Sequence, residues 1–197
     1  MLRWDKNDDI SLMINVLKHD GVLLASSDTV LGLFAQLSEK SKKKLDAIKR
    51  RNLKPYIVIV QSRHQISRFI DQELDVEIQN IMDRYWPGPL TMIFKAKSTL
   101  PYWMVGVDGT IAIRVPEHEG LQKILSHVHG LFTTSANISD QPLPMTYDQV
   151  NYEIVDQVDA SCCDPLAVYD GPASTIIDVS MGTIKIIRMG AIKIDSI

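Results

Sequence analysis

The chain has 197 residues, which supports one hydrophobic core, and we expect a single domain spanning residues 1–197. Hydrophobic residues make up 45% of the chain without a bilayer-length apolar run or a secretory signal pattern, so we expect a cytoplasmic protein with no membrane span. The formal charge of −3 argues against a broadly basic nucleic-acid-binding surface, because such surfaces spread positive charge over a whole face.

The first part of the chain predicts helices that alternate with strands. Apolar spacing predicts a helix over residues 8–19, and the apolar run at residues 22–25 predicts a buried strand. This strand ends at the polar cluster of residues 26–29, and such loop residues often line binding sites. A second helix over residues 38–48, capped by its first serine, and a β-branched strand over residues 55–62 are predicted to follow.

The remainder of the chain is richer in predicted strands than in helices. Helices are predicted near residues 64–70, 73–84 and 118–127. Strands are predicted at residues 90–96, 109–116, 130–137, 165–170, 174–180 and 183–190. Because helices do not alternate with strands to the end, we expect an α/β fold with a mixed sheet and helices packed against it.

Positive charge is concentrated in residues 40–54, which hold eight of the 21 Lys and Arg residues and one acid. Consecutive lysines cannot all reach one ligand from a helix, so residues 40–44 are expected to form a solvated helix face. Four more cations lie between the predicted helix and the next strand, where they either converge on a phosphate or carboxylate or simply face solvent. These four cations are Lys49, Arg50, Arg51 and Lys54.

Two other stretches hold polar residues that could bind a ligand. "TTSANIS" places Ser135 and Asn137 at a strand end, where they either orient a ligand or, more often, form a turn or cap. Arg114 in "IAIRVP" needs a fixed anion if it points inward, and is otherwise an edge residue. The sequence has no GxSxG, phosphate-loop or GxGxxG motif and no metal-ligand His spacing. Cys162 and Cys163 are adjacent, which favours free thiols over a strained disulfide.

Seven motifs occur in order along the chain: "SSDTVLGL", "KRRNLK", "WPGPLT", "IAIRVP", "TTSAN", "STIID" and "IIRMGAI". Together they resemble the YrdC/TsaC family of threonylcarbamoyl-AMP synthases over about residues 10–192. The resemblance implies an α/β fold whose twisted mixed parallel/antiparallel sheet and flanking helices enclose a large basic cavity. It also implies a nucleotidyltransferase that joins L-threonine, bicarbonate and ATP, with Mg²⁺, into L-threonylcarbamoyladenylate and pyrophosphate. A downstream threonylcarbamoyl transferase complex would use this product to modify tRNA.

The resemblance also implies roles for individual residues. It implies four catalytic residues, Lys49, Arg51, Ser135 and Asn137. It implies an L-threonine site formed by Ser27, Thr29, Arg114, Ser135 and Ser174. It implies an ATP site formed by Lys49, Arg50, Arg51, Lys54, Thr110, Asn137 and Arg188. No residue is assignable as a dedicated metal ligand.

The chain departs from the family pattern in ways that leave two questions open. Leu31 stands where the family usually has Tyr, which raises the question of altered threonine packing. The basic motif is one residue shorter than the usual K-x-R-P-x-x-K-P, so two alignments are possible. Either Lys49 and Arg51 match with a deletion before Lys54, or Arg50 keeps the family spacing to Lys54. We favour the first alignment because it retains both cations.

Two alternative functions follow from the same sequence. The first is an RNA-binding protein of the same fold without synthase activity, contacting tRNA weakly through residues 40–54. The second is the related domain of hydrogenase-maturation carbamoyltransferases, which handles carbamoyl phosphate. We rank the second low because that architecture normally includes acylphosphatase-like and zinc-finger portions that this sequence does not contain.

Overall fold

The computed structural model describes residues 1–51, 55–164 and 166–194. Its α-helices are α1 (Asn7–Lys18), α2 (Glu39–Lys49), α3 (Val76–Tyr85), α4 (Glu119–Leu125) and α5 (Tyr152–Gln157), and three short 3₁₀ helices are η1 (Arg63–Arg68), η2 (Tyr102–Met104) and η3 (Tyr147–Gln149). Its strands are β1 (Val22–Ala25), β2 (Gly32–Gln36), β3 (Ile57–Ile59), β4 (Leu90–Lys95), β5 (Thr110–Arg114), β6 (Leu131–Ser135), β7 (Ala160–Cys162), β8 (Thr175–Asp178) and β9 (Lys185–Arg188).

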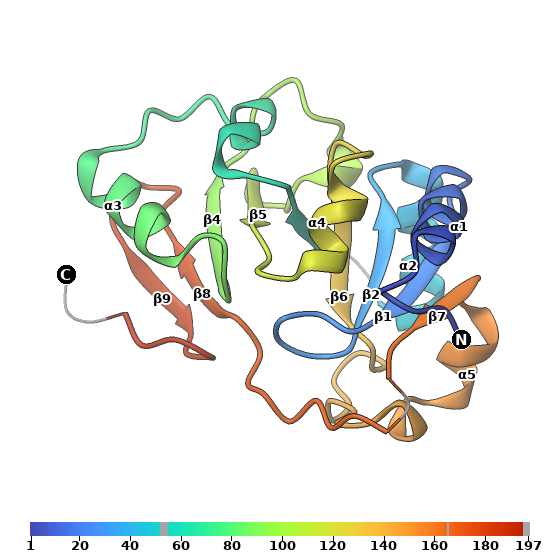
Figure 1. Ribbon diagram of the computed structural model, residues 1–197. Helices are drawn as coiled ribbons and strands as arrows, with labels where there is room; N and C mark the ends of the chain where they lie inside the picture. The colour runs from blue at the N-terminus through green and yellow to red at the C-terminus, as the bar shows by residue number, and fades with distance from the viewer. Residues whose placement is uncertain (52–54, 165, 195–197) are drawn as a thin grey trace.

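The described strands form one mixed sheet in the order β7-β1-β2-β6-β3-β5-β4-β8-β9 (Figure 1). The pairs β1–β7, β3–β5 and β4–β8 are parallel, and the other neighbouring pairs are antiparallel. The expected α/β fold with a mixed sheet is therefore confirmed. Among the described residues, no helix has the length and apolar character needed to span a membrane.

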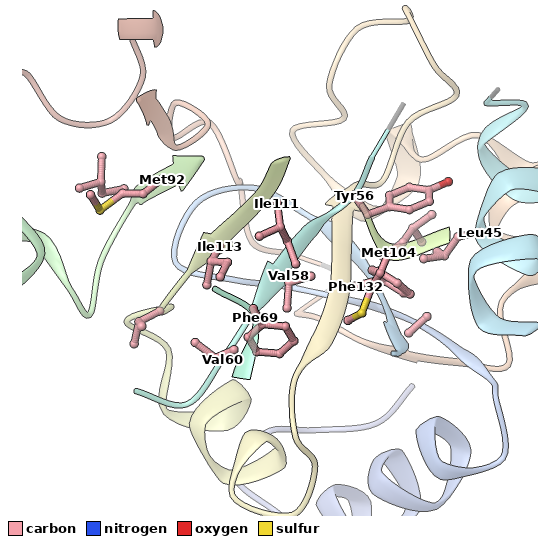
Figure 2. Close-up of a cluster of buried hydrophobic side chains, with 14 of the residues drawn as sticks. Leu45, Tyr56, Val58, Val60, Phe69, Met92, Met104, Ile111, Ile113 and Phe132 are labelled. Atoms are coloured by element: carbon pink, nitrogen blue, oxygen red, sulfur yellow. The ribbon is translucent and has the colours of Figure 1, made fainter. Parts of the chain in front are cut away.

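The two faces of the sheet are covered differently, because side chains alternate along each strand. On one face, Val58, Ile113 and Phe132 pack with Leu45 of α2 in the larger core cluster, which Figure 2 shows. On the other face, buried residues of α1 and α4 pack over only part of the sheet. These residues are Ile10, Met13, Leu17, Leu121, Ile124 and Leu125. The uncovered part of this second face carries the cavity described below.

Most of the predicted elements are found at or near their predicted positions. The strand at residues 22–25 is confirmed, and Ser38 caps α2 by accepting a hydrogen bond from the Ser41 amide (3.0 Å). The strand predicted at residues 165–170 is wrong, since residues 166–170 form no strand and residue 165 lies outside the described residues. Leu166 and Val168 are 91% and 62% exposed there, on the connection that links β7 to β8 (Figure 1).

Candidate active site

A cavity of about 460 Å³ lies on the partly uncovered face of the sheet. Its volume falls within the usual range for a small-molecule site. The sheet contributes alternate residues of neighbouring strands, namely Gly32, Phe34, Ile57, Ile59, Ile93, Ala112, Arg114, Thr133, Ser135, Ile176 and Arg188. Loops contribute Ser27, Asp28, Thr29, Val30, Arg51, Pro55, Pro116, Leu143, Ala173 and Ser174, and Leu121 of α4 and Thr134 of β6 complete the walls. The cavity thus joins residues that are widely separated in the sequence.

The charged groups around the cavity are mostly cationic. Arg51, Arg114 and Arg188 line it, and Asp28 is the one acid among its described lining residues. Burial lowers the pKa of each arginine from its ordinary value, and the charge of Arg114 lowers the pKa of Arg188 further. Arginine still remains protonated in proteins. The cavity is therefore suited to an anionic ligand.

Arg114 at the end of β5 points inward and is only 6% exposed. Its Nε donates to the Gly88 carbonyl (3.0 Å), and its Nη1 donates to Thr29 Oγ1 (3.0 Å). Its Nη2 lies 2.5 Å from Asp28 Oδ2, in an ion pair whose side chains are 7% and 10% exposed. The fixed anion expected for an inward-pointing Arg114 is therefore Asp28, a member of the polar cluster at residues 26–29 for which no individual role was predicted.

Asp28 and Thr29 are placed by the tight loop between β1 and β2. Ser27 Oγ donates to the Val30 carbonyl (2.8 Å) and accepts from the Thr29 amide (3.2 Å). These two bonds shape the turn that presents Thr29 to Arg114. Ser27 lines the cavity as well, but its hydroxyl is already engaged within the loop.

Arg50 and Arg51 point in different directions where α2 ends. Arg50 adopts a left-handed backbone conformation (φ 49°), and its exposed guanidinium pairs with Glu153 at 2.5 Å. Arg51 lines the cavity, its guanidinium lies 4.8 Å from the centre of the Tyr56 ring, and its Nη2 donates to the Pro55 carbonyl (2.7 Å). Of the two alignments of the basic motif, the one that uses Arg51 places its arginine on the cavity wall.

The buried Lys49 braces the turn that follows β6. Its Nζ donates to the Ser135 carbonyl (2.7 Å), to Asn137 Oδ1 (2.8 Å) and to the Asn137 carbonyl. Ser135 Oγ donates to the same Asn137 Oδ1 (2.6 Å). Burial, together with the charge of Arg51, lowers the pKa of Lys49 to about 8, although these oxygens hold its ammonium form. Of this network, only Ser135 belongs to the described lining of the cavity.

Another part of the cavity wall is formed by Ser174 and Arg188. Ser174 Oγ bonds with Thr91 Oγ1 (2.9 Å), and Arg188 Nη2 donates to the Ser174 carbonyl (2.8 Å). Gly190 allows the chain after β9 to pass close to the backbone of Ala173, because a Cβ atom at Gly190 would lie 2.1 Å from the Ala173 carbonyl oxygen. Ser174, predicted for the threonine site, and Arg188, predicted for the ATP site, both line the cavity.

Thr110 and Lys54 are the remaining residues of the predicted ATP site. Thr110 shares a strand face with Arg114 but is not among the described lining residues, and its hydroxyl donates to Asp108 (2.7 Å). Lys54 lies outside the described residues. The roles predicted for the individual residues stay predictions, whether or not they line the cavity.

The two remaining sequence questions concern Leu31 and the lysine-rich helix. Leu31 is fully buried in the larger core cluster and does not line the cavity. The lysines of residues 40–44 each pair with a carboxylate of the protein. The pairs are Lys40–Asp20 (3.6 Å), Lys42–Asp46 (2.6 Å), Lys43–Glu39 (2.8 Å) and Lys44–Asp159 (2.6 Å). This compensation weakens the case for an RNA-binding surface on α2.

Within residues 1–51, 55–164 and 166–194, no three His, Cys, Asp or Glu side chains are grouped so that they could hold a metal ion. The thiols of Cys162 and Cys163 are free and buried, and burial raises the pKa of Cys162 to about 12 and that of Cys163 to about 11. Both are thiols at neutral pH and carry no sign of nucleophilic activation.

Comparison with known proteins places the chain in a sequence family. The model Sua5_yciO_yrdC, described as "Telomere recombination", matches residues 15–190. A relative from Methanocaldococcus jannaschii, provisionally named as a threonylcarbamoyl-AMP synthase, is 33% identical over 178 residues, covering 89% of this chain and 83% of the relative. The threonylcarbamoyl-AMP synthase of Escherichia coli K12 is 34% identical over 151 residues, covering 74% of this chain and 78% of the synthase.

A solved structure extends the similarity to the fold. The crystal structure of P. abyssi Sua5 complexed with L-threonine matches with a TM-score of 0.85 and 27% identity. The match covers 96% of this chain, which in turn spans 56% of the Sua5 chain.

Proposed function

Because the chain belongs to the Sua5/YciO/YrdC family, we propose that it is an L-threonylcarbamoyladenylate synthase, a nucleotidyltransferase acting on L-threonine, bicarbonate and ATP. The names of the curated relatives and the L-threonine complex of Sua5 support this proposal. The observation that carries it is a cavity in which Arg51, Arg114 and Arg188 surround hydroxyl-bearing residues. One amino-acid carboxylate and several phosphates are the anions that this set would bind.

L-threonine would bind at the Arg114 end of the cavity. Arg114 is held by Gly88 and Thr29, so its fork is fixed before the carboxylate arrives. Ser135 and Ser174 line the same cavity and supply hydroxyl groups. A site fixed in advance binds with a smaller entropy cost than one that must become ordered.

ATP would place its phosphates near Arg51 and Arg188. Arg51 Nε is buried without a hydrogen-bond partner among the described residues, which is consistent with unused binding capacity. Lys49 acts behind the wall, where it fixes the turn that carries Ser135 and Asn137. Mg²⁺ would enter with ATP, bound to its phosphates as part of the substrate, since no metal-binding group occurs among the described residues.

The reaction needs positioning more than it needs a protein nucleophile. The neutral threonine amine attacks the carbon of bicarbonate, and loss of water leaves a carbamate. A carbamate oxygen then attacks the α-phosphorus of ATP, and the bond to the departing pyrophosphate breaks. Arg51 and Arg188 would offset the negative charge that develops on the phosphates during this transfer.

The product would then leave for a second enzyme. A threonylcarbamoyl transferase complex would transfer its threonylcarbamoyl group to tRNA, giving N6-threonylcarbamoyladenosine in the cytoplasm. Direct tRNA contact by this chain would be weak at most, because the lysines of α2 are paired with its own carboxylates.

The proposal is tested by pyrophosphate release from the purified protein. We expect release with L-threonine, bicarbonate and MgATP together, and a loss of release when any one of the three is left out. Replacing L-threonine with D-threonine is a matched control for stereochemistry. Release that continues without threonine or bicarbonate would indicate simple ATP hydrolysis and would reject the proposal.

A further inference from the structure

The carboxylate of Asp28 has binding capacity that the protein itself does not use. Its side chain is 10% exposed, and its Oδ2 faces Arg114 Nη2 (2.5 Å) and accepts from the Glu117 amide (2.9 Å). Its Oδ1 is buried and has no hydrogen-bond partner among the described residues. A buried carboxylate oxygen left in this state is unfavourable, and a charged donor is its strongest partner.

The neighbouring groups do not supply such a donor. Arg114 Nη2 lies 2.5 Å from Oδ2 and has no hydrogen-bond partner among the described residues. His118 lies near Asp28, but its Nδ1 accepts from the Leu121 amide (3.2 Å). Burial lowers the pKa of His118 below its ordinary value, and the charge of Asp28 opposes this effect.

The cation Arg114 and the anion Asp28 therefore lie side by side on the cavity wall, and each can form further hydrogen bonds to a ligand. Arg114 donates its Nε hydrogen to the Gly88 carbonyl and one Nη1 hydrogen to Thr29 Oγ1. The other N–H groups of its guanidinium remain for a ligand. Asp28 and Arg114 both line the cavity. The α-ammonium of an amino acid is attached to the carbon next to its carboxylate, so a carboxylate bound to Arg114 brings the ammonium close to Asp28.

We propose that Asp28 is a specificity-determining residue that binds the α-ammonium of L-threonine through Oδ1, while Arg114 binds the carboxylate. This inference rests on the proposed function and concerns recognition of the zwitterion, before the ammonium gives up its proton. The Asp28–Arg114 pair selects α-amino acids over hydroxy acids of the same shape. It leaves discrimination of the threonine side chain to the rest of the cavity.

The test compares two ligands that differ only in the amino group. Calorimetric titration without ATP gives the Kd of L-threonine and of (R)-3-hydroxybutanoate for the wild type and for Asp28→Asn, Asp28→Glu and Asp148→Asn. Asp148 is an exposed acid outside the cavity, so its substitution matches the charge change. The wild type and Asp148→Asn should prefer L-threonine by about tenfold or more, and Asp28→Asn should lose this preference by weakening L-threonine alone.

Each other result overturns the inference. If Asp28→Asn weakens both ligands equally, Asp28 merely holds Arg114 in place. If it leaves both affinities unchanged but alters the Mg²⁺ dependence of pyrophosphate release, Asp28 serves the metal–ATP complex. Should Asp28→Asn fail to fold, the wild type and Asp28→Glu remain decisive, because the absence of a preference for L-threonine in both contradicts the assignment.

The inference and the proposed function can fail separately. Pyrophosphate release that depends on L-threonine, without an Asp28-dependent preference in binding, refutes the inference alone. A preference that depends on Asp28, without pyrophosphate release, refutes the proposed function alone.

Discussion

Replacing Arg51 with Ala should impair catalysis far more than replacing Arg50 with Ala. The two arginines are adjacent, carry the same charge and directly follow the same helix, so each is a matched control for the other. Arg51 lines the cavity, whereas Arg50 is directed to Glu153 and its side chain is 63% exposed. Only the loss of Arg51 removes a cation from the wall where the phosphates of ATP are proposed to bind.

The expected magnitudes follow from these surroundings. A hydrogen bond to a charged group in a partly buried site contributes about 1.5–3 kcal/mol. Loss of one such bond between Arg51 and a phosphate lowers kcat/KM for ATP by roughly 10- to 150-fold. Arg50 forms an exposed ion pair, which contributes about 0–1 kcal/mol to stability and nothing to substrate binding. Arg50→Ala should therefore keep kcat/KM within about twofold of the wild type.

The assay is pyrophosphate release at saturating L-threonine and bicarbonate with ATP varied. Thermal unfolding of both variants serves as a control, because Arg51 also packs over Tyr56 and donates to the Pro55 carbonyl. Equal losses in two folded variants, or a larger loss in Arg50→Ala, would refute the assignment. The second of these outcomes would favour the alignment in which Arg50 keeps the family spacing.

Three further predictions concern Lys49, Leu31 and the lysines of α2. Lys49 should titrate near pH 8 by NMR, below the ordinary lysine pKa of 10.5. Between these two pH values the unfolded chain holds this proton and the folded protein does not. The free energy of unfolding should therefore rise with pH in the wild type but not in Lys49→Met, and an ordinary lysine pKa would contradict this. Leu31→Tyr should lower the free energy of unfolding, measured in urea, by about 1–3 kcal/mol without changing L-threonine affinity, because Leu31 is fully buried away from the cavity. Tighter L-threonine binding at an unchanged free energy of unfolding would argue against this. Changing the three lysines at 42–44 to Gln should leave tRNA affinity and its salt dependence unchanged in fluorescence anisotropy, since each is paired with a carboxylate, and lost affinity would revive the RNA-binding alternative.

Local sequence signals were sufficient for elements whose residues interact with near neighbours. Ser38 caps α2 through the Ser41 amide, as its position before the helix predicts. In contrast, residues 165–170 look β-rich, but Leu166 and Val168 are exposed on a connection. Gly32 opens strand β2, which the sequence analysis missed, because this strand follows a polar loop and is defined by pairing with β1 and β6.

Prediction of the site was limited in the same way, by contacts between residues far apart in the sequence. An inward-pointing Arg114 requires an anion, and this could be predicted, but its partner Asp28 lies on another loop far away in the sequence. Similarly, composition cannot distinguish Arg50 from Arg51, because the difference arises from the left-handed conformation of Arg50 at the end of α2. The partner of Arg114 and the orientations of Arg50 and Arg51 could therefore be identified only from the tertiary structure.

The most direct test of the central claim is identification of the product by mass spectrometry. The purified protein is incubated with L-threonine, MgATP and isotopically labelled bicarbonate, and the quenched reaction is analysed for L-threonylcarbamoyladenylate. We predict an adenylate that carries the bicarbonate carbon, with pyrophosphate formed in equal amount. Pyrophosphate or AMP without the labelled threonylcarbamoyl group would contradict the account.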